Sequence, residues 1–216
     1  MTRRLLLVRH GNTFETGAPV VRVGARSDLP LTAKGIEQAR IFGSAARAAG
    51  LAMGPFIAGP LSRTRAFVEH AFGVRPRADD RLREIDYGSW EGLTDGEIAT
   101  AAGAETLEAW NRRCSWPAGQ GWSPDPETIE RGAAGLIDEL SAGDPAFVPV
   151  LCSSQGILRY FAKRDAAWFA AALAKGGLGV GTGNCCGMSV EGGHVRVAFW
   201  NAKPDAGALR DWRAAG

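Results

Sequence analysis

Residues 4–9 read Arg4-Leu5-Leu6-Leu7-Val8-Arg9, and this short aliphatic run decides how the rest of the chain is interpreted. A continuous apolar run of this length is typical of a strand that is buried on both faces, as in a parallel sheet. Two later runs, 55–59 and 147–152, predict strands of the same kind. Because Pro149 cannot donate to a neighbouring strand, we expect the last of them not to be central and fully paired along its whole length.

Helical patterns alternate with these strands. Thr32 is placed to cap a helix that runs to about residue 49, and Ser62 is placed to cap a helix after the second strand. Thr94 and Glu97 have the spacing of a capping box, which opens another helix. Further helices are expected over residues 128–140 and from about residue 156.

The remaining segments fit the same layered arrangement. We expect a loop over residues 110–126 and a hairpin over residues 187–200. No internal repeat or linker divides the sequence. The fold class that we predict is therefore α/β: a single three-layer domain over residues 1–216, with a mostly parallel central sheet flanked by helices.

Composition narrows the class of protein. The 216 residues are 45% hydrophobic and 22% charged, which excludes disorder for most of the chain. The net charge of +2 and the absence of a long apolar run give no support for a nucleic-acid or membrane partner. The four cysteines lack C-x-x-C spacing and the three histidines lack ligand spacing. We therefore expect no metal, no cofactor and a reducing, cytoplasmic location.

Polar side chains follow the three predicted strands, at the edge of the sheet where such folds bind ligands. The first strand ends in Arg9-His10-Gly11, and Arg63 lies at the start of the helix after the second strand. The third strand runs through Ser153 and Ser154 into a helix. Helix N-termini offer free backbone N–H groups, and arginine forks match phosphate oxygens. The sequence therefore predicts a site for a phosphoryl group.

Five segments also resemble, in order and spacing, the motifs of the histidine phosphatase (phosphoglycerate mutase-like) superfamily. The matching patterns are R-H-G, D-x-P-L-T-x-x-G-x-x-Q-A, S-x-L-x-R, L-x-E-x-x-x-G-x-W-E-G and S-H-G-x-x-[IL]-R, which correspond to residues 7–13, 28–39, 59–64, 82–92 and 152–159. A lone R-H-G would be weak evidence, whereas the ordered set covers most of the chain. The resemblance implies a phosphoglycerate mutase-like fold.

The resemblance also implies two catalytic residues. His10 would be the nucleophile that takes the phosphoryl group, and water would then hydrolyse the phosphohistidine. Glu84 would protonate the leaving oxygen and later help to activate water. Asp86 is an alternative for this acid.

Other matched positions are implied to bind the substrate. Arg9 and Arg63 would neutralise charge on the phosphoryl oxygens, and Asn12 would contact phosphate or substrate in the loop after the nucleophile. Position alone places Arg22 and Arg26 where they could face the substrate.

The sequence departs from the family pattern where a second histidine is expected. Counting back from Arg159 puts Ser154 at that position, and Gln155 is the other side chain close by. We expect Ser154 or Gln155 to bind the substrate there, but neither can carry a positive charge. A second departure is Trp122, which stands between Gly121 and Ser123 where many members have an acidic residue.

These observations favour a metal-independent phosphomonoesterase that acts on a phosphorylated small molecule, with a homodimer left open. One alternative is a catalytically weak or silent phosphate-binding protein, because Ser154 replaces the second histidine. Another is a phosphoglycerate-type mutase, which both departures disfavour.

Overall fold

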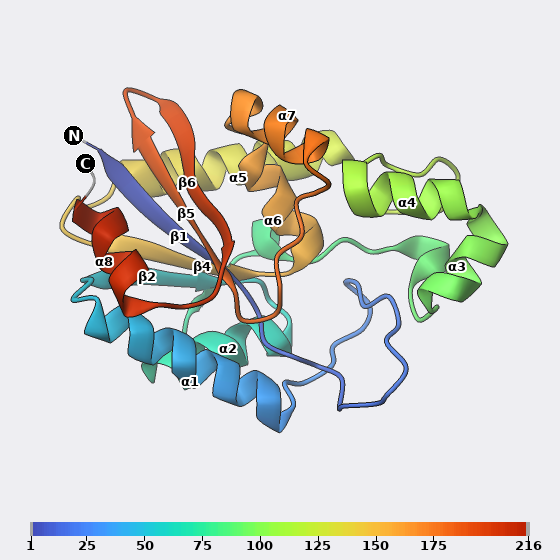
Figure 1. The fold of residues 1–216 in the computed structure, drawn as a ribbon, viewed down its shortest axis with the longest axis horizontal. Helices are drawn as coiled ribbons and strands as arrows, with labels where there is room; N and C mark the ends of the chain where they lie inside the picture. Colours follow the sequence, from blue (N-terminus) through green and yellow to red (C-terminus); the bar gives the residue numbers. More distant parts are fainter. Residues whose placement is uncertain (1, 215–216) are drawn as a thin grey trace.

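The computed structural model describes residues 2–214 (Figure 1). Within them, one sheet has the strand order β3-β2-β4-β1-β5-β6. Its strands are β1 (Arg3–Arg9), β2 (Met53–Ala58), β3 (Arg77–Ala78), β4 (Val148–Ser153), β5 (Cys185–Glu191) and β6 (His194–Ala202). Strands β1 to β4 pair with one another in parallel. The hairpin of β5 and β6 is antiparallel, and β5 also pairs antiparallel with β1. The predicted mostly parallel sheet and the hairpin are both confirmed.

Helices cover both faces of this sheet, as Figure 1 shows. The α-helices are α1 (Ala33–Ala48), α2 (Ser62–Phe72), α3 (Asp95–Ala102), α4 (Ala104–Arg113), α5 (Pro126–Ser141), α6 (Gln155–Ala162), α7 (Ala166–Ala174) and α8 (Ala206–Ala214). The short 3-10 turns Asp80–Leu82 and Gly88–Trp90 lie between α2 and α3. The predicted three layers are therefore confirmed.

The alternation of side chains along β1 explains the two cores. Leu6 and Val8 face α1, α2 and α8, whereas Leu5 and Leu7 face the side of the sheet that α5 and α6 cover. All four of these side chains are at most 1% exposed. The four cysteines are buried and free, as small apolar side chains in a core would be.

Pro149 is accommodated in a central strand. β4 lies between β2 and β1, but its pairing with β1 begins only at Val150. On the other side, the register with β2 shifts between Met53 and Phe56. Pro149 thus lies in the irregular first part of β4, and the expectation that this strand is not fully paired along its length is confirmed.

Local helix signals were correct at two of the three predicted caps. Thr32 accepts a hydrogen bond from the Gly35 N–H at 3.2 Å, and Thr94 with Glu97 forms the capping box. Ser62 does not cap α2: it is the first helical residue, and its own N–H and hydroxyl both donate to Asp28 at 2.7 Å. A carboxylate at this N-terminus replaces the cap that we predicted from Ser62.

Residues 110–126 are only partly the predicted loop. α4 continues to Arg113, because the buried Leu107 and Trp110 lie on one face of an amphipathic helix. None of the helices within residues 2–214 is both long and apolar enough to cross a membrane.

Candidate active site

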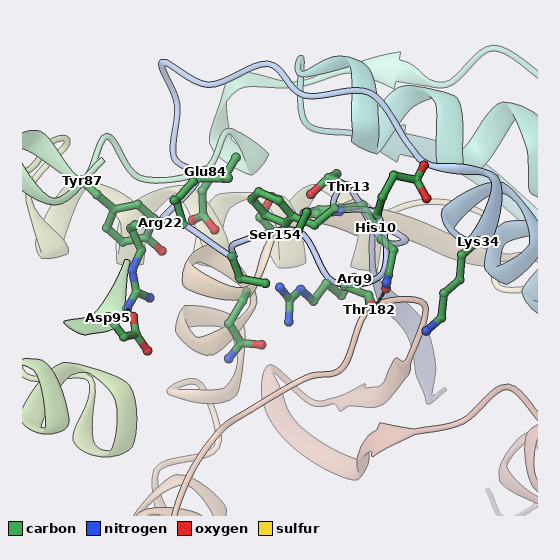
Figure 2. Close-up of a pocket in the computed structure, with 18 of the residues that line it drawn as sticks. Arg9, His10, Thr13, Arg22, Lys34, Glu84, Tyr87, Asp95, Ser154 and Thr182 are labelled. Carbon is green, nitrogen blue, oxygen red and sulfur yellow. Dashed lines mark hydrogen bonds and ion pairs between the residues drawn. The ribbon is translucent and has the colours of Figure 1, made fainter. Parts of the chain in front are cut away.

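A cavity of about 810 Å³ lies at the carboxyl ends of β1 and β4 (Figure 2). Its wall comes from the loop after β1, from the segment 84–87, from α3 and α4, and from the start of α6. The residues that line it are Arg9, His10, Asn12, Thr13, Phe14, Glu15, Thr16, Gly17, Ala18, Val20, Val21, Arg22, Val23, Lys34, Glu84, Tyr87, Asp95, Trp110, Asn111, Ser154, Gln155, Arg159 and Thr182. The carboxyl edge of the parallel strands thus holds the site, as expected for such a fold.

The parallel register of β1 and β4 brings the nucleophile loop to the start of α6. Arg9 pairs with Ser153, and the His10 N–H donates to the Ser153 carbonyl at 3.1 Å. Gly11 follows, and a Cβ there would lie 2.4 Å from the Gly35 carbonyl oxygen. Glycine at this position therefore lets the loop pass directly against α1.

His10 is held as a neutral imidazole. Its side chain is buried, and Nδ1 lies 2.8 Å from the Gly11 carbonyl oxygen. Since a carbonyl only accepts, Nδ1 carries the proton and Nε2 keeps the lone pair. Burial, together with the positive charges of Arg9 and Arg63, holds the pKa of His10 well below its ordinary value. The nucleophile that the sequence predicts is thus unprotonated near neutral pH.

The two predicted phosphate-binding arginines occupy different places. Arg9 lines the cavity, and its guanidinium donates to the Val180 carbonyl at 2.7 Å. Arg63 is fully buried and is absent from the cavity wall. Its guanidinium donates to the carbonyls of Ser27 at 2.6 Å and Gly24 at 3.2 Å. Arg63 is therefore outside the cavity wall in this structure, although its charge contributes to the lowered pKa of His10.

Glu84 lies in the cavity wall with its carboxyl group buried. One oxygen accepts from the Ile85 N–H at 2.9 Å and the other from the Gly156 N–H at 3.1 Å. Burial raises the pKa of Glu84 above its ordinary value, although these two donors and the nearby arginines oppose the shift. A carboxyl group with a raised pKa is suited to give up a proton. Asp86, the alternative acid, is outside the cavity wall and accepts from Arg26 instead.

Asn12 is fixed by a small hydrogen-bond network at the edge of the cavity. Its backbone N–H donates to Gln38 at 2.8 Å, and its side-chain oxygen accepts from the Thr182 hydroxyl. Gln38 in turn donates to the Thr182 carbonyl at 3.0 Å. The Asn12 side-chain N–H₂ group has no partner in this network and is the part that can reach a ligand.

Ser154 and Gln155 both line the cavity, but only Ser154 is uncommitted. Gln155 donates to the Leu178 carbonyl at 2.9 Å and accepts from the Val180 N–H at 2.6 Å. Ser154 is the N-cap residue of α6, and its buried hydroxyl has no hydrogen-bond partner among the described residues. Of the two side chains at this point of the family pattern, Ser154 is therefore the one whose hydroxyl remains free for a ligand.

Several residues line the cavity that the matched motifs did not mark as part of the site. Of the two arginines singled out by position, Arg22 lines the cavity, whereas Arg26 lies outside it and pairs with Asp86 and Glu91. Arg159, the last residue of the fifth matched segment, also lines the wall. Residues that no pattern marked as functional include Lys34, Tyr87, Asp95, Trp110, Asn111 and Thr182. Within residues 2–214, no three His, Cys, Asp or Glu side chains gather as a metal-binding cluster.

Curated proteins similar to this chain include proteins named as phosphoglycerate mutases. A protein named "Probable phosphoglycerate mutase GpmB" from Salmonella arizonae is 34% identical over 130 residues, which are 59% of this chain and 56% of that protein. A 2,3-bisphosphoglycerate-dependent phosphoglycerate mutase from Brucella ovis is 32% identical over 123 residues, 54% of this chain and 59% of that protein. The chain thus spans a little over half the length of these relatives.

Solved structures match over nearly the whole chain. A mycobacterial glucosyl-3-phosphoglycerate phosphatase has a TM-score of 0.73 at 26% identity, over 94% of this chain and 100% of that one. A structure described as "Mycobacterial hydrolase 2" has a TM-score of 0.75 at 24% identity, over 99% and 97% of the two chains, and shows likeness of fold. The family model of the histidine phosphatase superfamily (branch 1) matches residues 5–203. The chain belongs to this superfamily.

Proposed function

We propose that the protein is a metal-independent phosphomonoesterase that hydrolyses a phosphorylated small molecule through a phosphohistidine on His10. The observation that carries this proposal is the state of His10. Its Nδ1 donates to Gly11, which leaves the lone pair on Nε2, and burial together with the charges of Arg9 and Arg63 lowers the pKa of the ring and keeps it neutral. A neutral, oriented imidazole beside cationic groups is suited to attack a phosphoryl group.

The reaction needs two steps. In the first, the Nε2 lone pair of His10 bonds to phosphorus and the bond from phosphorus to the ester oxygen breaks, while Glu84 gives its proton to that oxygen. In the second, water attacks phosphorus, the bond to nitrogen breaks with its electron pair returning to His10, and Glu84 takes the proton of water. Ester and water thus become alcohol and inorganic phosphate. Arg9 and the Ser154 hydroxyl, which both line the cavity, would stabilise the charge on the transferred group.

Two alternative functions, a mutase and a silent phosphate-binding protein, predict a different fate for the phosphoryl group. A phosphoglycerate mutase, the activity that the curated relatives are named for, would pass the phosphoryl group to a second hydroxyl of the substrate instead of to water. A silent protein would bind phosphate without turnover, and the uncharged Ser154 at the position of the second histidine favours this possibility. The four free, buried cysteines support a reducing, cytoplasmic location for any of these activities.

The test is an assay of purified protein on phenyl phosphate and aliphatic phosphomonoesters, with and without a chelator. We expect release of inorganic phosphate that the chelator does not change, and its loss in His10→Asn. The matched control is His70→Asn, because His70 is an exposed histidine of α2 outside the cavity. Phosphate binding by calorimetry without turnover would support the silent protein, and transfer to a second position of 3-phosphoglycerate without net release would support the mutase.

A further inference from the structure

The cavity is much larger than a phosphoryl group requires. Its volume of about 810 Å³ lies in the range of pockets that enclose whole small-molecule ligands. In Figure 2, Arg22, Tyr87 and Asp95 stand at one end of the cavity, and His10 lies toward the other. The end near Arg22 is therefore available to the part of the substrate that does not react.

A buried guanidinium without a carboxylate partner lies at this end. Arg159 of α6 lines the cavity with only 6% of its surface exposed. It donates to the backbone carbonyls of Trp110 at 3.0 Å and Asn111 at 3.2 Å, and it lies 4.9 Å from the centre of the Trp110 ring. Among the described residues no Asp or Glu forms an ion pair with it. Carbonyl and ring contacts orient the Arg159 charge but leave it unneutralised.

Arg22 reaches the same point from the loop after β1. Its guanidinium donates to the Asn111 side chain at 3.3 Å and to the exposed Asp95 carboxylate at 2.8 Å, and it lies 5.6 Å from the Tyr87 ring centre. Asn111 thus contacts both arginines: its side chain accepts from Arg22 and its backbone carbonyl accepts from Arg159. Two side chains from distant parts of the sequence are held together by one residue of α4.

The charges at this end do not cancel. This end holds two guanidinium groups, Arg22 and Arg159, and one carboxylate, Asp95. Asp95 pairs with Arg22, and its side chain is 65% exposed. Glu84, another carboxyl of the wall, is buried with a raised pKa and accepts from two backbone donors. Over the whole wall, Arg9, Arg22, Lys34 and Arg159 face Glu15, Glu84 and Asp95. A buried excess of positive charge is stabilised when an anion binds.

We propose that Arg22 and Arg159 form a second anion-binding subsite, so that the substrate is a phosphomonoester with another anionic group on its leaving part. This inference rests on the proposed function and names the substrate class of the same cavity. Each planar guanidinium can bind a carboxylate or a second phosphate through two parallel hydrogen bonds, so both anions suit this subsite.

The test compares esters that differ only at the far end. Glycerol 3-phosphate, 3-phosphoglycerate and glycerol 1,3-bisphosphate share a three-carbon chain and end in a neutral, a carboxylate or a phosphate group. Phenyl phosphate and 4-carboxyphenyl phosphate form a longer pair. We expect kcat/KM for an anionic member to exceed that of its neutral partner by about tenfold or more, the effect of one hydrogen-bonded charge. The preferred member distinguishes carboxylate from phosphate.

Variants then assign the preference to residues. Arg22→Met and Arg159→Met are each expected to reduce the anionic-to-neutral ratio to within about threefold of unity. Arg26→Met is the matched control, because Arg26 is exposed, pairs with Asp86 and Glu91 and lies outside the cavity. This variant is expected to keep the anionic-to-neutral ratio of the unchanged protein. Arg159→Met also removes two hydrogen bonds to backbone carbonyls, so if it fails to fold the more exposed Arg22 decides the test.

The outcomes separate this inference from the proposed function. Equal kcat/KM for neutral and anionic esters in both sets, or a preference that survives in the Arg22 and Arg159 variants, overturns the subsite while the phosphatase stands. If no ester is hydrolysed, the phosphatase proposal fails by itself. The same compounds are then compared by their Kd in calorimetry, where the same ratios decide whether the subsite exists.

Discussion

The Gly156 N–H donates to a carboxyl oxygen of Glu84 at 3.1 Å, and this hydrogen bond joins the acid to the helix that carries Ser154. Gly156 lies at the second position of α6, where backbone N–H groups have no partner within the helix. A Cβ at Gly156 would lie 2.4 Å from the other Glu84 oxygen and 2.4 Å from the Tyr87 hydroxyl. A larger residue at position 156 would therefore have to displace one of these side chains, so glycine here lets the Glu84 carboxyl group lie against α6.

Gly156→Ala is expected to reduce kcat strongly. The added methyl group must displace Glu84 or α6, and a displacement of about 1 Å at a catalytic group can cost about 100-fold in rate. Steady-state kinetics on phenyl phosphate measure this effect. Gly135→Ala in α5 is the control: its Cβ would meet only the end of the Arg81 side chain at 3.6 Å, and full activity is expected. Equal activity of the two variants would show that Glu84 does not depend on this contact.

The pH dependence of kcat/KM follows from two opposite pKa shifts. In the proposed mechanism, transfer to His10 needs His10 unprotonated and Glu84 protonated. The pKa of His10 is lowered by burial and by Arg9 and Arg63, so His10 stays neutral into mildly acidic solution. The pKa of Glu84 is raised by burial, so its proton is lost only above the usual range for a carboxyl group. We expect the highest rate in mildly acidic solution and a fall as pH rises through the Glu84 pKa.

Glu84→Gln tests which group causes that fall. The amide cannot give a proton to the leaving oxygen, so the decline at higher pH is expected to disappear. The loss in kcat/KM, which reports transfer to His10 and not the later hydrolysis, should reach about 100-fold for an alkyl phosphate, whose leaving oxygen needs a proton. It should be much smaller for 4-nitrophenyl phosphate, whose leaving group is stable as an anion. A loss that is the same for both esters would remove Glu84 from the role of acid.

Ser154→His is expected to raise kcat more than it lowers KM. The Ser154 hydroxyl is buried, lines the cavity and has no partner among the described residues, so an imidazolium there would add a charged donor beside the phosphoryl group. Such a donor is worth about 1–3 kcal/mol, or about 5- to 150-fold in rate. No change beyond twofold would place Ser154 away from the reacting group.

Gln155→Ala is the companion to this experiment. Gln155 is bonded to Leu178 and Val180, and the Val180 carbonyl also accepts from Arg9. Loss of the Gln155 side chain is expected to lower activity, because the Val180 segment that holds Arg9 loses its support. If Gln155→Ala alone stops turnover and Ser154→His lowers it, Gln155 rather than Ser154 contacts the phosphoryl group.

The sequence predicted most of the fold because the decisive signals are local. The run Leu5–Val8 has the apolar character of a buried strand, and Thr32 and Thr94 are caps whose partners lie within three residues. The prediction that Ser62 caps α2 was wrong because its hydrogen-bond partner, Asp28, lies 34 residues away, and no local rule predicts such a contact. The end of α4 was missed because glycine, proline and tryptophan gather after Trp110, while the helix itself is stabilised by burial of one face.

Parts of the candidate site could not be read from motifs. Matched segments marked His10 and Glu84, and both line the cavity. They also marked Arg63, whose guanidinium is turned to the carbonyls of Ser27 and Gly24, a choice that only tertiary contacts decide. The meeting of Arg22 and Arg159 at Asn111 depends on how α4 lies against α6, and sequence spacing carries no information about it.

Detection of a phosphoryl group on His10 tests the central claim most directly. Protein mixed with a ³²P-labelled phosphomonoester and quenched in alkali within one turnover is digested, and the labelled peptide is sequenced by mass spectrometry. The account predicts an alkali-stable, acid-labile label on His10 that forms and decays as fast as turnover, with no label in His10→Asn. Turnover without this label, or a label on another residue, would contradict it.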